Sequence, residues 1–188
     1  MATSKVNICS NALLLLGDSP ISSFNGDSNR ALLSSNLWDN ARQAVLRAHP
    51  WNCAKEMVAL APETGAPAFD WDYKFLLPGE CLRVLFVGQE GDPDDYLVNG
   101  RRILANVNPL YLTYIYDNTD IASWDASLVQ AMEVYMAARM AYPITKSTTL
   151  RDSMYAEYAN LLKTAKSIDG QEEPPQTVGD SPFITARH

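Results

Sequence analysis

The fold class of this chain depends on residues 96–105, which read YLVNGRRILA. Apolar and aromatic residues stand on both sides of the Asn99-Gly100 pair, and these two residue types tolerate the positive φ angles of a type I′ turn. The stretch therefore predicts a β-hairpin near the middle of the chain.

Further strands are expected on both sides of this hairpin. After Pro62 the spacing of apolar residues changes from near four to near two, and residues 81–87 read as a buried strand. Residues 110–115 are apolar or aromatic at alternating positions on both faces, as in a strand buried between neighbours. We expect these segments to form one small antiparallel β lobe over residues 51–118.

Apolar residues recur at helical spacing on either side of that lobe. The first helix is expected over residues 5–16, with Gly17 in the position of a C-cap glycine. The second begins after Ser28 as N-cap and ends at His49, because a residue before proline avoids the helical region. Two helices therefore precede the lobe.

Two more helices are expected after it. The third has Ser123 or Asp120 as its N-cap and is closed by Pro143, and the fourth covers residues 149–168. The sequence thus predicts an α+β fold, in which residues 1–50 and 119–168 form an antiparallel four-helix bundle. The β lobe is inserted between helices two and three.

Residues 169–188 are predicted to form an extended C-terminal tail. They contain residues that interrupt regular structure, namely Pro174, Pro175, Gly179 and Pro182. Such a segment cannot pack a core of its own. Phe183, Ile184 and Arg187 are nevertheless the anchors expected of a segment that orders on binding, although a frayed terminus is an equal alternative. These three are the candidate partner-binding residues.

Composition limits the classes of protein that the chain can represent. It has 188 residues, of which 47% are hydrophobic and 20% charged, as in ordinary globular proteins. The longest apolar stretch, residues 12–16, is too short to cross a bilayer, and we expect no secretory signal and no membrane contact. The net charge of −7 disfavours a surface that grips nucleic acid, but suits a wall past which DNA slides.

The usual signatures of catalysis and cofactor binding are missing from the sequence. The two histidines, His49 and His188, allow no HExxH motif or convincing triad, and no glycine-rich phosphate loop is present. The cysteines Cys9, Cys53 and Cys81 are odd in number and far apart, which favours buried thiols over disulfides or metal ligands. We therefore expect no enzyme activity, no cofactor and no metal site.

Two weaker patterns leave alternatives open. The acidic cluster of Asp92, Asp94 and Asp95 could bind calcium, but it lacks the remaining EF-hand ligands, so a solvated hairpin loop is favoured. The tryptophans and tyrosines could stack on sugars or bases, yet most stand at helix or strand spacing, and core packing explains them better.

Several segments resemble the phage tail tubular protein A family. They are residues 15–21, LLGDSPI; residues 44–52, AVLRAHPWN; residues 59–61, ALA; residues 75–84, FLLPGECLRV; and residues 114–116, YIY. The order and spacing of these segments fit the family over about residues 8–170. They are signatures of a fold and carry no catalytic residue.

The resemblance implies a virion structural protein at the head–tail junction, made in the host cytoplasm. Such a protein forms a ring, twelvefold in relatives, that joins the portal protein to the tail nozzle or tail tube. Genomic DNA passes through the lumen without specific binding. If ring closure needs the portal as a template, the free protein is a monomer whose tail orders on docking.

Two other functions remain open from the sequence. One is a head-completion or stopper connector of a long-tailed phage, which the small β lobe permits. The other is a tail-associated glycan-cleaving enzyme that uses a carboxylate pair, whose separation a sequence does not reveal.

Overall fold

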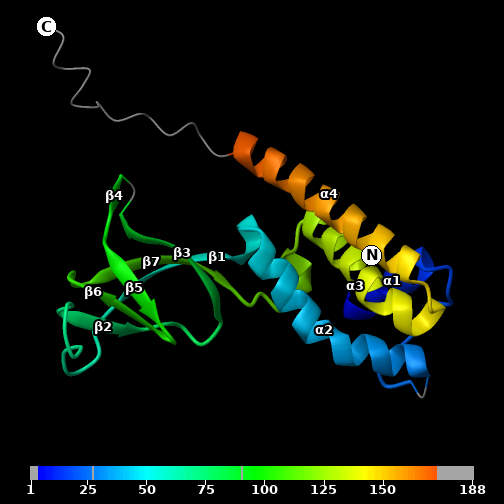
Figure 1. Ribbon diagram of the computed structural model, residues 1–188, viewed down its shortest axis with the longest axis horizontal. Helices are drawn as coiled ribbons and strands as arrows, with labels where there is room; N and C mark the ends of the chain where they lie inside the picture. Colours follow the sequence, from blue (N-terminus) through cyan, green and yellow to red (C-terminus); the bar gives the residue numbers. More distant parts are fainter. Residues whose placement is uncertain (1–3, 27, 90, 173–188) are drawn as a thin grey trace, which may run out of the picture.

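The computed structural model describes residues 4–26, 28–89 and 91–172 (Figure 1). Its helices are α1 (Lys5–Leu15), α2 (Asn29–Ala48), α3 (Ala126–Thr145) and α4 (Thr148–Glu172), with short 3-10 turns η1 (Asn52–Ala54) and η2 (Ile121–Ser123). Its strands are β1 (Lys55–Leu60), β2 (Tyr73–Leu76), β3 (Cys81–Gln89), β4 (Asp92–Pro93), β5 (Tyr96–Asn99), β6 (Arg102–Ala105) and β7 (Leu110–Tyr116). We call the four α-helices the helical part and the seven strands the β part.

The chain is α+β, but the predicted antiparallel four-helix bundle is wrong. In such a bundle the apolar stripes of all four helices face one shared axis. Here α3 is the central helix, and α1, α2 and α4 each pack chiefly on α3 rather than on one another. The other end of α2 contacts β3 and β7, so part of its apolar stripe faces a sheet.

Most predicted helix ends follow from local chemistry. Ser28 caps α2 by accepting the backbone N–H of Ala31, as expected. Gly17 has a φ of +73°, and its N–H bonds the carbonyl of Leu14 while that of Asp18 bonds Leu13. These bonds form a Schellman motif, which ends α1 where the sequence predicts.

The predicted ends of the third helix are wrong. Asp125 is the N-cap of α3 and accepts the N–H of Leu128 at 2.7 Å, whereas Asp120 caps the preceding turn η2. Pro143 lies inside α3 rather than closing it, and α4 continues to Glu172, beyond the expected end at residue 168. The expected start of an extended tail at residue 169 is therefore helical.

The β part contains two antiparallel sheets, ordered β1-β7-β3-β4 and β2-β6-β5. They face each other across a core of buried residues: Phe75, Leu77, Val87, Ile103, Ala105, Leu110, Leu112 and Tyr114. The β5–β6 hairpin is present, but its two-residue turn is Gly100-Arg101, because Asn99 pairs with Arg102. Only Gly100 has a positive φ, +61°, so the turn fits type II′ rather than the expected type I′.

The helical and β parts are joined through α2 and β7. Ile115 of β7 is fully buried in the helical core. The nearly buried Arg42 of α2 donates from Nε and Nη2 to the two carboxylate oxygens of Asp117, at 2.7 and 2.9 Å. Gln43 donates to the same carboxylate at 2.9 Å. A bidentate ion pair of this kind fixes the direction in which the chain leaves β7.

Candidate partner-binding surface

The three residues singled out from the sequence, Phe183, Ile184 and Arg187, lie outside the described residues. Their role in partner binding therefore stays a prediction. Within the described part of the chain, the helices also expose apolar side chains such as Leu14 and Leu32, but the β part combines exposed apolar residues with a strand at the end of a sheet, β5.

Strand β5 forms the end of the three-stranded sheet and pairs only with β6 within that sheet. All of its residues are exposed, including the apolar Tyr96 (39%), Leu97 (49%) and Val98 (45%). We call Tyr96–Asn99 the open β5 edge. Exposed apolar edge strands are templates for pairing with another strand, and proteins usually protect them with charges, prolines or a covering segment.

The direction of the backbone groups along this edge follows from the register. Asn99 and Arg102 close a two-residue hairpin, so they exchange both of their backbone hydrogen bonds. The bonding pattern alternates along an antiparallel pair, and Leu97 therefore bonds to β6 while Val98 and Tyr96 do not. The N–H and C=O groups of Val98 and Tyr96 point outward, toward a strand that could be added.

The side chains of these two residues face the inside of the β part. Val98 pairs with Ile103 and Tyr96 with Ala105, and both partners are fully buried in the core between the sheets. Val98 and Tyr96 stay half exposed because the facing sheet does not cover this end. The apolar inner face of the three-stranded sheet thus extends beyond the four-stranded sheet that covers it, and it ends at the open β5 edge.

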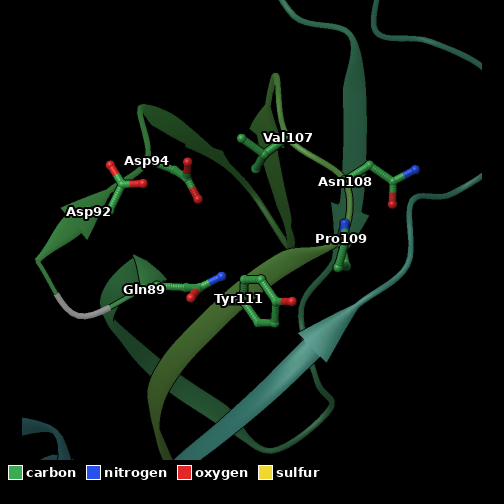
Figure 2. A pocket seen from close by; sticks show the side chains of 7 residues that line it. All are labelled: Gln89, Asp92, Asp94, Val107, Asn108, Pro109 and Tyr111. Atoms are coloured by element: carbon green, nitrogen blue, oxygen red, sulfur yellow. The ribbon is translucent and has the colours of Figure 1, made fainter.

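A hollow of about 280 Å³ lies close by, lined by Gln89, Asp92, Asp94, Val107, Asn108, Pro109 and Tyr111. Figure 2 shows Asp92 and Asp94 on one side of it and Asn108 and Pro109 on the other. Asp92 belongs to β4, which pairs with the end of β3, and Asp94 follows β4 and donates its backbone N–H to the carbonyl of Val87. Over residues 4–26, 28–89 and 91–172, no group of three or more candidate ligands is placed to hold a metal ion. The two carboxylates make the hollow acidic.

The second exposed apolar feature is the outer face of the four-stranded sheet. Glu56 pairs with the buried Tyr114, so the next residue, Met57, faces outward and is 80% exposed. Tyr111 lies on the same face and is 40% exposed. At the other end of this face the helices cover Ile115. The helical part therefore covers only one end of the outer face.

The shifted pKa values of three ionisable groups are explained by burial and by hydrogen bonds within the fold. Burial raises the pKa of Cys9 to about 12, which keeps this thiol protonated and unreactive. Burial, together with a hydrogen bond to Glu56, raises the pKa of Tyr114. Burial opposes the ionisation of Asp117, but hydrogen bonds from Arg42 and Gln43 hold its pKa below the ordinary value. None of these groups lines the hollow.

The sequence pattern predicts β5 as a strand but gives no sign that it ends a sheet. The apolar run of Tyr96, Leu97 and Val98 differs from the apolar and polar alternation of a strand covered on one face, but a central strand buried on both faces has the same run. No described helix is long and apolar enough to serve as a membrane span. Comparison of the chain with protein-family models and with curated protein sequences finds no match.

Proposed function

We propose that this chain is a subunit of a head-to-tail adaptor ring, which joins the portal of a tailed bacteriophage to its tail nozzle. The main support is the resemblance to the tail tubular protein A family over about residues 8–170. The structural observation that favours a binding role is the exposed apolar strand at the open β5 edge. The ion pair of Arg42 with Asp117 holds the β part, and with it this edge, in a fixed position against the helices.

A ring of identical subunits requires two different surfaces on each copy, one matching the other on the next subunit. The exposed outer face around Met57 and the open β5 edge are two such apolar surfaces on one chain. They supply the kind of area that is buried when neighbours or a further ring pack against the β part.

Portal binding is assigned to the C-terminal tail, with Phe183 and Ile184 as apolar anchors and Arg187 as the charged one. Aromatic and arginine side chains are the residues that contribute most to binding energy in interfaces. A segment that reaches the portal only when the portal is present also prevents rings from closing before the portal is available. The net charge of −7 suits a lumen through which DNA passes without being held.

The test is negative-stain imaging and mass measurement of the purified protein, alone and after mixing with its cognate portal. We expect rings seated on the portal. The triple variant Phe183→Ala/Ile184→Ala/Arg187→Ala should lose them, whereas the matched tail control Gln176→Ala/Thr177→Ala/Val178→Ala should keep them. A protein that never associates with the portal, at low or high salt, contradicts the adaptor role.

A further inference from the structure

We infer that residues 183–187, FITAR, dock as an added antiparallel strand on the open β5 edge of the same subunit. This goes beyond the proposed function, because it says where the segment assigned to the portal is held when no portal is present. Three properties of residues 183–187 favour them as the added strand: their backbone, their charge and their covalent connection to α4.

A strand added to β5 must be a short extended segment whose backbone can form hydrogen bonds on the side that faces β5. The outward N–H and C=O groups of Val98 and Tyr96 need partners two residues apart on the added strand. Residues 183–187 contain no proline, and Pro182 stands before them, where a strand tolerates proline. Their Phe, Ile and Thr residues are common in strands.

Charge selects the direction of the added strand. The chain just before β5 carries Asp94 and Asp95, and the turn just after it carries Arg101. In an antiparallel arrangement Arg187 lies opposite Asp94 or Asp95, whereas in a parallel arrangement it lies beside Arg101. Opposite charges across a strand pair are favourable and like charges are not. The antiparallel direction is therefore preferred.

The side chains of the added strand fit the uncovered inner face. If Val98 pairs with Phe183, Arg187 lies opposite Asp94, and if Val98 pairs with Ile184, Arg187 lies opposite Asp95. In both registers one large apolar residue lies on the inner face beside Val98 and Tyr96, which are 45% and 39% exposed. The added strand thus covers the apolar surface that the facing sheet leaves open.

The covalent connection between α4 and residues 183–187 favours docking on the same chain. Residues 173–182 follow α4 and could span up to about 33 Å when extended. In the view of Figure 1, α4 ends on the side of the molecule where the sheets lie. A segment tethered in this way has an effective concentration in the millimolar range, far above that of a second copy in dilute solution.

The experiment is residue-resolved amide hydrogen exchange by NMR on the full-length chain without portal, at two protein concentrations. The comparison variants are a chain ending at Glu172 and Arg187→Glu, and the matched control is Arg151→Glu on α4. The amides of Tyr96 and Val98 should exchange about tenfold more slowly in the full chain than in the shortened one, as expected if the segment is docked about nine-tenths of the time. Leu97, which already bonds to β6, should change little.

Arg187→Glu should lose most of this protection, and Arg151→Glu should keep it. Combining Arg187→Glu with Asp94→Arg and Asp95→Arg should restore it. Equal exchange in the full and shortened chains overturns the inference. Protection that persists in the chain ending at Glu172 also overturns it, because it indicates pairing of two β5 edges. Protection that rises with protein concentration overturns it as well, because it indicates a segment from another subunit. Because no portal is present, these results are independent of portal binding.

Discussion

The ion pair that joins α2 to the end of β7 provides the sharpest test of the fold. Asp117→Ala would leave the Arg42 guanidinium, whose side chain is 7% exposed, paired with the largely exposed carboxylate of Asp39. Removing one partner of a buried pair costs about 3–5 kcal/mol. The Asp117 side chain is 16% exposed and Asp39 stays in place, so we expect a loss of about 2–3 kcal/mol.

The assay is urea denaturation at pH 7, followed by circular dichroism. Arg42→Met keeps an apolar side chain of similar length, and the double variant Arg42→Met/Asp117→Ala removes both charges. Because the cost comes from an unpaired buried charge, the double variant should be more stable than Asp117→Ala alone. The control is Asp18→Asn, which disrupts the more exposed pair of Asp18 with Arg30 and should change stability much less.

The same pair gives a dependence on pH. The pKa of Asp117 is lower in the folded protein than in an unfolded chain, so its contribution is complete above about pH 4 and is lost as the pH falls through the folded value. The difference in stability between the wild-type protein and Asp117→Ala should therefore shrink on acidification. If Asp117→Ala is no less stable than Asp18→Asn at pH 7, the role assigned to this pair is wrong.

Two other predictions concern a glycine and a cysteine. Gly88 has a φ of +112°, and an added Cβ would lie 2.5 Å from the carbonyl oxygen of Asp92, so Gly88→Ala should lower the melting temperature and shift the NMR signals of Asp92 and Asp94. Gly79→Ala, with no atom within 4 Å, should do neither, and equal behaviour of the two variants would refute the steric argument. Cys9 is fully buried with a pKa of about 12, so iodoacetamide at pH 8 should leave it unmodified in the native protein and label it in urea, as read by peptide mass spectrometry. Labelling of native Cys9 as fast as that of the partly exposed Cys53 would contradict its burial.

Features decided by neighbouring residues could be predicted from the sequence. The Schellman motif at Gly17 and the Ser28 cap depend on a few adjacent groups. The N-cap of α3 was missed because Asp120, Ser123 and Asp125 all suit that role, and only the structure shows that Asp120 caps the 3-10 turn. Strand β1 falls inside the predicted β lobe of residues 51–118, but the spacing of apolar residues does not mark it as a strand, because its exposed Met57 does not follow the pattern of a half-buried strand.

Features decided by distant residues could not be predicted. An apolar stripe shows which face of a helix is buried, but not whether a helix or a sheet covers it, and α2 uses its stripe for both. The open β5 edge likewise depends on strand order. The pattern of residues 96–98 is the same for a strand in the middle of a sheet and one at its end, and the candidate surface of this protein follows from that difference.

Strand β7 has a consequence for how the molecule responds to force. It contributes Leu110, Leu112 and Tyr114 to the core between the sheets, and Ile115 to the helical core, within a single strand. An extended backbone stretches very little, so a pull on the sheets is carried along β7 directly to Ile115 and the helices around it. Load applied to one end of the subunit would therefore reach the other end through one strand, and the two cores should resist it together.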